Sequence, residues 1–101
     1  MWLFAMFDLP TDTKKAKKQY VEFRRLLLEE GFSMLQYSVY ARYCASEEHS
    51  TAHRRRIHAS LPPDGHIRLV AITDRQFGKM EIFYGKKRDP AEEAPQQLML
   101  F

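Results

Sequence analysis

The chain has 101 residues, of which 45% are hydrophobic and 29% charged, and its formal net charge is +3 at pH 7. This size predicts one domain with its own core. No apolar stretch approaches the ~18 residues of a membrane span, so a membrane-spanning protein is excluded. The single cysteine, Cys44, excludes an internal disulfide, and the first residues lack the pattern of a secretory signal. We therefore expect a cytoplasmic protein.

The first predicted element is a strand over residues 2–7, a short apolar run typical of a strand buried on both faces. Asp8 follows it directly. A buried strand does not end on a carboxylate unless that group lies at an open rim, finds a partner or binds a cation. Asp8 is therefore the main candidate catalytic group, although an aspartate shortly before Pro10 is also a common turn former.

A long helix is predicted between Thr11 and Gly31, because apolar residues recur there at helical spacing between N-cap candidates and a glycine suited to end the helix. Four lysines crowd its first turns, where the helix dipole favours acidic residues and each cation costs ~0.3–1 kcal/mol. A single lysine is more often a solvated helix residue, but four together favour a polyanion lying across the helix start. These candidate nucleic-acid ligands are Lys14, Lys15, Lys17 and Lys18.

Residues 32–43 alternate with period two, which predicts one bent strand or two short ones. A second helix is expected from Ser46 to Pro62–Pro63, followed by a strand over 67–73 and a final strand over 80–84. This order predicts an α+β protein, a ferredoxin-like βαββαβ sandwich with two helices on one face of an antiparallel sheet, plus a C-terminal strand and tail. The opposite face is left bare, so we expect a homodimer that covers it.

Two further basic clusters favour contacts with the phosphates of an extended double-stranded nucleic acid. They are Arg54, Arg55 and Arg56 in the second helix, and Lys86, Lys87 and Arg88 after the final strand. His49 and His53 lie four residues apart near Cys44. Without further ligands, a surface histidine pair beside arginines is favoured over a metal site.

The domain is predicted to cover residues 1–85. Residues 86–101 are expected to form a basic and acidic linker that ends in an apolar tail. Such a tail suits docking onto a partner by strand addition or into a groove, and a disordered end is the alternative. The residues expected to bind the partner are Leu98, Met99, Leu100 and Phe101.

One carboxylate per chain is too few for a self-contained two-metal nuclease. Mg²⁺ keeps most of its waters and accepts one or two protein carboxylates together with phosphate oxygens. Two Asp8 side chains facing each other across a two-fold axis could therefore hold one Mg²⁺ against a phosphodiester, with a water molecule as the nucleophile. If two copies place these groups far apart, only a binding role remains.

Four segments together resemble the CRISPR-associated adaptation proteins of the Cas two family: MWLFAMFDLP, KKAKKQYVEFRRLLLEEGF, MLQYSVYARY and IRLVAITDRQFGKMEIFYG. The resemblance covers residues 1–85 and implies a ferredoxin-like fold and a homodimer that exchanges a C-terminal strand. It implies that this dimer bridges two dimers of the integrase Cas one, in an assembly that captures duplex DNA and inserts it as a new spacer. The basic residues near the first helix and the C-terminal strands would contact the DNA backbone.

The same resemblance implies a second possibility, since some members of the family are magnesium-dependent endonucleases acting on single-stranded RNA or double-stranded DNA. The family's metal aspartate corresponds to Asp8. Three functions are therefore open: a DNA-bridging subunit of CRISPR adaptation, which leads; a Mg²⁺-dependent endonuclease; and a stand-alone RNA-binding or toxin-like module.

Overall fold

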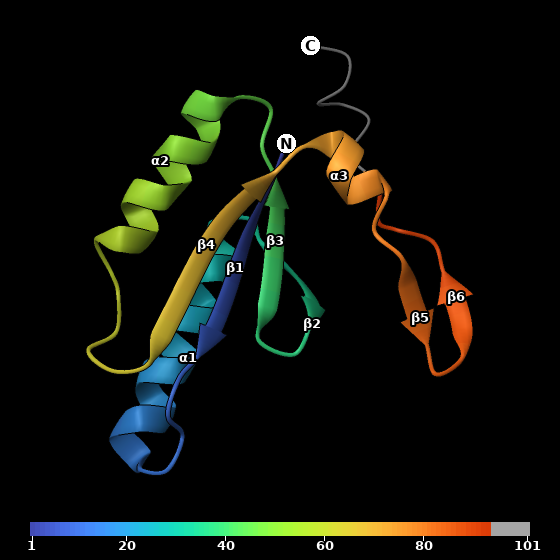
Figure 1. The fold of residues 1–101 in the computed structure, drawn as a ribbon. Helices are drawn as coiled ribbons and strands as arrows, with labels where there is room; N and C mark the ends of the chain where they lie inside the picture. Colours follow the sequence, from blue (N-terminus) through green and yellow to red (C-terminus); the bar gives the residue numbers. More distant parts are fainter. Residues whose placement is uncertain (94–101) are drawn as a thin grey trace.

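The computed structural model describes residues 1–93, which form a four-stranded sheet, two longer helices, one short helix and a separate two-stranded sheet (Figure 1). The elements in chain order are β1 (Trp2–Asp8), α1 (Lys14–Glu29), β2 (Ser33–Gln36), β3 (Val39–Tyr43), α2 (Glu47–His58), β4 (His66–Ile72), α3 (Asp74–Gly78), β5 (Ile82–Tyr84) and β6 (Lys87–Asp89). The larger sheet has the order β2-β3-β1-β4, and all of its neighbouring strands are antiparallel. This is a ferredoxin-like βαββαβ arrangement, so the predicted fold class is confirmed.

Both predicted helices are confirmed, and each begins at a side-chain cap. The Thr13 hydroxyl accepts a hydrogen bond from the Ala16 N–H at 3.0 Å, and the Ser46 hydroxyl accepts one from the His49 N–H at 3.1 Å. The chain leaves α1 through Gly31, whose φ of +84° lies in the left-handed region that glycine tolerates. No helix among residues 1–93 combines the length and the apolar composition that crossing a bilayer requires.

The main core lies between one face of the four-stranded sheet and the two helices α1 and α2. Alternate residues of β1 project into it and meet apolar side chains of both helices, as period-two and helical spacing require. The buried residues from these three elements are Leu3, Ala5, Phe7, Phe23, Leu27 and Ile57. Two helices therefore cover one sheet face, as predicted.

The opposite sheet face is not wholly bare, which corrects the prediction. The short helix α3, absent from the predicted elements, places Phe77 on this face with 2% of its surface exposed. The Phe77 ring stacks on Trp2 with centroids 4.1 Å apart and meets Phe4 edge-on at 6.0 Å. Farther along the same face Val70 stays 41% exposed, so α3 covers only the end near Trp2.

Two segments form hairpins. The sequence left the first open as one bent strand or two short ones, and it predicted the second as a single strand. Residues 32–43 form the two short strands β2 and β3, joined by a turn in which Ser38 has a φ of 61°. The predicted final strand is also a hairpin: β5 pairs with β6 across Gly85 in a sheet of its own. It lies beside the four-stranded sheet in Figure 1 and spans the predicted domain boundary between residues 85 and 86.

Candidate functional site

Asp8 ends β1 with its side chain exposed at the rim of the sheet. Its cross-strand partner on β4 is His66, and two residues earlier on β1, Met6 lies opposite Arg68. Directly opposed residues of an antiparallel pair project from the same face. Asp8, His66 and Arg68 therefore share the sheet face that α1 and α2 do not cover.

These three side chains border one cavity of about 370 Å³. Met6 and Val39 contribute apolar surface to its wall, and the turn residue Ser38 also lines it. No group of three or more His, Cys, Asp or Glu side chains within residues 1–93 is arranged to hold a metal ion. One chain thus offers Mg²⁺ a single carboxylate, which fits an ion that keeps most of its waters and takes its other ligands from a phosphate or a second copy.

Gly65 holds the loop before β4 close against Asp8. Its φ is +91°, and a Cβ placed on it would lie 2.5 Å from the Asp8 carbonyl oxygen and 2.7 Å from Leu9 Cδ2. Only glycine tolerates both the left-handed conformation and this approach. The position of Asp8 relative to β4 therefore depends on a residue without a side chain.

The four lysines of the first turns of α1 are all exposed, and none forms an ion pair within residues 1–93. The loop from Leu9 to Thr13 connects Asp8 to this helix start, so the lysines and the carboxylate lie toward the same end of the molecule (Figure 1). The structure thus brings together two of the features that the sequence singled out.

The arginines of α2 differ in availability. Arg54 is half-buried and its Nε donates to Ser50 Oγ at 3.3 Å, while Arg56 Nε donates to Glu30 Oε1 at 2.6 Å. The Arg55 side chain is exposed and makes no hydrogen bond in the part of the chain that the structure describes. Of the three candidate ligands, Arg55 is therefore the one with a free guanidinium.

The third basic cluster, Lys86, Lys87 and Arg88, is exposed on the β5–β6 hairpin. The start of α1, α2 and this hairpin occupy separate places around one copy of the chain (Figure 1). A single copy therefore does not join the three clusters into one surface. The expected partner-binding residues Leu98, Met99, Leu100 and Phe101 lie outside the described residues.

The predicted surface histidine pair is instead partly buried, which corrects that expectation. His53 is 5% exposed, and its Nδ1 lies 2.7 Å from Glu30 Oε1 at the end of α1. Its Nε2 lies 3.2 Å from His49 Nε2. A sequence signal was available, because Ser50, His53 and Ile57 have the spacing of one helix face, the buried face of α2.

Stability is expected to fall on acidification because of this cluster. Burial alone raises the pKa of Glu30, but hydrogen bonds from Arg56 and His53 outweigh it, so the Glu30 pKa lies below its ordinary value. Burial, then the charges of Arg42, His53 and Arg56, lower the pKa of His49. Both groups bind protons more readily when the chain is unfolded, so their contribution is present at neutral pH and is lost as pH falls.

Urea unfolding at a series of pH values from 7.5 to 4 measures this effect. The loss should begin below the ordinary histidine pKa of about 6.5 and continue below that of glutamate, about 4.3. His49→Gln should remove the first part of the decline and leave the second. A wild-type midpoint that rises between pH 7.5 and 5.5 would contradict the assignment.

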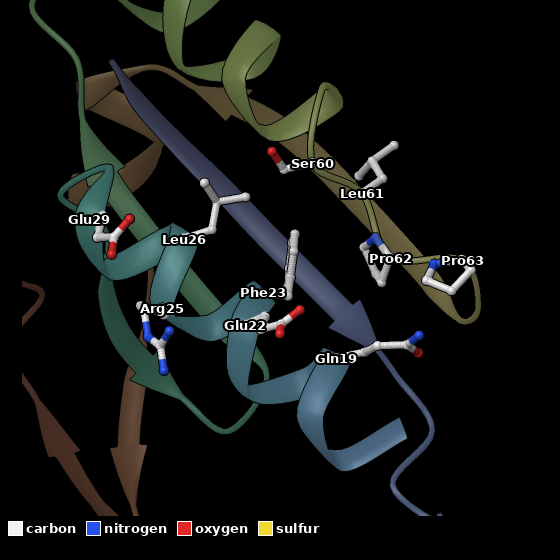
Figure 2. Close-up of a pocket in the computed structure, with 10 residues that line it drawn as sticks. All are labelled: Gln19, Glu22, Phe23, Arg25, Leu26, Glu29, Ser60, Leu61, Pro62 and Pro63. Carbon is white, nitrogen blue, oxygen red and sulfur yellow. The ribbon is translucent and has the colours of Figure 1, made fainter. Parts of the chain in front are cut away.

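A second hollow of about 370 Å³ lies between α1 and the loop after α2 (Figure 2). Phe23 and Leu26 of α1 face Leu61 and Pro62 of the loop, and two carboxylates, Glu22 and Glu29, stand beside Arg25. This lining is apolar and acidic. It does not suit a phosphate, so the Asp8 cavity is the better candidate for nucleic-acid chemistry.

Known proteins agree with this picture. The family model of "CRISPR associated protein Cas2" matches residues 1–80. A CRISPR-associated endoribonuclease Cas2 from Parvibaculum lavamentivorans is 54% identical over 101 residues, covering all of both chains. Another from Flavobacterium psychrophilum is 52% identical and covers all of this chain and 88% of the relative.

The fold has a solved counterpart as well. A crystal structure of Streptococcus pyogenes Cas2 at pH 6.5 superposes with a TM-score of 0.63 at 15% identity, covering 83% of this chain and 100% of that one. At this identity the likeness shows the fold alone. The family match and the two close relatives carry the assignment further: the chain belongs to the CRISPR-associated Cas2 family.

Proposed function

We propose that two copies of this chain pair and serve as the DNA-bridging subunit of CRISPR adaptation, binding duplex DNA through its phosphates and linking dimers of the integrase Cas one. The observation that carries the proposal is the group of four exposed lysines at the start of α1, which have no ion-pair partner within residues 1–93. Their charges oppose the helix dipole, and a polyanion relieves that penalty.

Exposed apolar groups support the pairing of two copies. On the hairpin, Phe83 is 57% and Tyr84 80% exposed, and on the open sheet face Val70 is 41% exposed. The two outer strands of the larger sheet, β2 and β4, each have one edge without a partner strand within residues 1–93. A second copy that covers the open face or adds a strand to an edge buries these groups, and it doubles the number of basic clusters.

Charge reversal of Lys14, Lys15, Lys17 and Lys18 to Glu tests the DNA role. We expect duplex DNA affinity to fall about tenfold to a hundredfold near physiological salt, with a log–log salt slope shallower by up to about four per chain. Fluorescence anisotropy titrations over a range of salt concentrations measure both. Because Glu in the first turn suits the helix dipole, the reversal should not destabilise α1.

The matched control is Arg25→Glu, which reverses an exposed charge farther along the same helix. It should change duplex affinity much less than the fourfold reversal. An unchanged salt slope in the lysine variant, with circular dichroism like the wild type, would count against phosphate binding by this helix start.

A second candidate function is a Mg²⁺-dependent endonuclease acting on single-stranded RNA. It is favoured by the exposed Asp8 carboxylate in a cavity that it shares with His66 and Arg68, and by the name endoribonuclease given to the close relatives. Asp8 would hold the ion, alone or together with Asp8 of a second copy. When bound, Mg²⁺ neutralises phosphate charge and lowers the pKa of a bound water. Within the chain, Asp8 fixes the position of that chemistry at the rim of the sheet.

A further inference from the structure

Arg68 is an arginine without a protein acceptor in residues 1–93, unlike Arg24, Arg42 and Arg56. Arg24 donates to the Tyr40 hydroxyl at 2.8 Å, Arg42 to the Glu30 carbonyl at 2.9 Å, and Arg56 to the Glu30 carboxylate. The exposed Arg68 side chain makes no hydrogen bond or ion pair in residues 1–93. Within one copy, its guanidinium therefore has no protein acceptor and can bind a ligand.

The register of β1 and β4 sets where that ligand would bind. Asp8 lies opposite His66, and Arg68 is two residues farther along β4 on the same face. All three groups border the same cavity of about 370 Å³. Asp8 and Arg68 sit diagonally across the two strands, a spacing of about 7–8 Å that leaves room for a group between them.

We propose that Arg68 and His66 form a phosphate subsite that holds a backbone phosphate of single-stranded RNA beside Asp8. The proposal rests on the endonuclease candidate and names how its substrate is positioned. A guanidinium binds two phosphate oxygens at once, and an imidazole N–H can donate to a third. The apolar surface of Met6 and Val39 suits the neighbouring sugar or base.

Single-stranded RNA is the favoured ligand because the subsite is an open hollow at the sheet rim whose exposed side chains a flexible strand can reach with a single phosphate. A single strand can turn one phosphate inward, and its unstacked bases can follow. A duplex keeps its phosphates on a rigid outer path, which suits the exposed lysines of α1 better. The two basic features therefore divide between two forms of nucleic acid.

RNA binding measured without metal separates the roles of these residues, because replacing Arg68 or His66 should lower RNA affinity whereas replacing Asp8 should raise it. In EDTA, we expect Arg68→Gln to weaken the binding of a short, fluorescently labelled single-stranded RNA about tenfold, and His66→Gln about threefold. Asp8→Asn should instead tighten it, because a carboxylate repels a phosphate held beside it. Arg68→Lys should restore part of the affinity, since it keeps the charge but not the two-oxygen geometry.

The matched control is Arg75→Gln, on the exposed surface of α3, which should bind this RNA nearly as the wild type does. Equal losses in Arg68→Gln and Arg75→Gln would mean a general charge effect and would overturn the subsite. An equal or larger loss of duplex DNA affinity in Arg68→Gln would overturn it too, by assigning Arg68 to the duplex surface. Size-exclusion chromatography checks that each variant keeps the oligomeric state of the wild type.

The outcome for the endonuclease candidate is read separately, from cleavage in Mg²⁺. If Asp8→Asn loses cleavage while Arg68→Gln binds RNA like the wild type, the subsite is wrong and the endonuclease stands. If the wild type does not cleave but Arg68→Gln weakens RNA binding as expected, the endonuclease fails and the subsite remains as a binding site.

Discussion

Asp8→Asn is expected to lower Mg²⁺-dependent cleavage of single-stranded RNA by more than about 100-fold, because the neutral amide removes the one carboxylate that each chain offers the ion and with it several kcal/mol of charge stabilisation. The substitution keeps the size of the side chain. Since Asp8 is exposed and makes no ion pair within residues 1–93, the fold should be unaffected. Duplex DNA affinity should change less than about twofold, because the proposed duplex site is the group of lysines at the start of α1.

The control for this experiment is Asp12→Asn, which makes the same chemical change on the exposed loop between β1 and α1. Cleavage by this variant should match the wild type. If the two variants cleave equally well, Asp8 does not hold the metal, and any activity in the preparation has another source.

Spacer integration in cells then decides between the two candidate functions. A subunit that bridges and binds DNA should support acquisition of new spacers when Asp8 is replaced by Ala. Loss of acquisition with that variant, at unchanged protein level and DNA affinity, would assign the chemistry of Asp8 to adaptation itself.

The core of the fold was predictable because its signals are periodic and strong. The apolar run of β1, the helical stripe of α1 and the period-two pattern of residues 32–43 each span enough residues to indicate helix or strand, although the pattern of residues 32–43 did not say whether they form one strand or two. They became the sheet and helix that the structure shows. Each helix must bury its apolar stripe and each strand its apolar face, and packing the helices on one face of the sheet in a βαββαβ sandwich does both.

The C-terminal part was predicted less well because its elements are short. The helix α3 has only five residues, too few for a helical repeat, and its clearest sequence signal is the capping box of Thr73 and Gln76. The strand β6 reads Lys-Arg-Asp and is exposed throughout, so it has no apolar alternation to identify it. Pairing with β5 across Gly85 is what makes it a strand.

Of the candidate site, Asp8 was predictable from the sequence, whereas His66 and Arg68 were not. Asp8 was identified because a carboxylate at the end of a buried strand is unusual in itself. His66 and Arg68 are ordinary surface residues in their own segment. They join Asp8 only through the register of β1 with β4, which connects residues far apart in the chain. A single sequence does not contain that register, whereas the spacing that places His53 on the buried face of α2 was present and could have been used.

The contact between α3 and the sheet should dominate the stability of the C-terminal half. Phe77→Ala removes a ring that is 2% exposed and stacked on Trp2, and a change of this kind costs about 3–5 kcal/mol. For a domain of this size the melting temperature should fall by more than about 10 °C. Phe77→Leu keeps most of the buried volume and should recover much of the loss.

Phe83→Ala makes the same chemical change on the hairpin, where the ring is 57% exposed, and it should alter the unfolding of a single copy by less than about 1 kcal/mol. Melting curves at several protein concentrations separate folding from pairing, because only stability gained through a second copy depends on concentration. If the hairpin takes part in the dimer, Phe83→Ala should weaken that dependence, whereas Phe77→Ala should lower the melting temperature at every concentration. If the two variants lowered the melting temperature equally, the packing of α3 on Trp2 would be contradicted, because that contact is what buries Phe77 while Phe83 stays exposed.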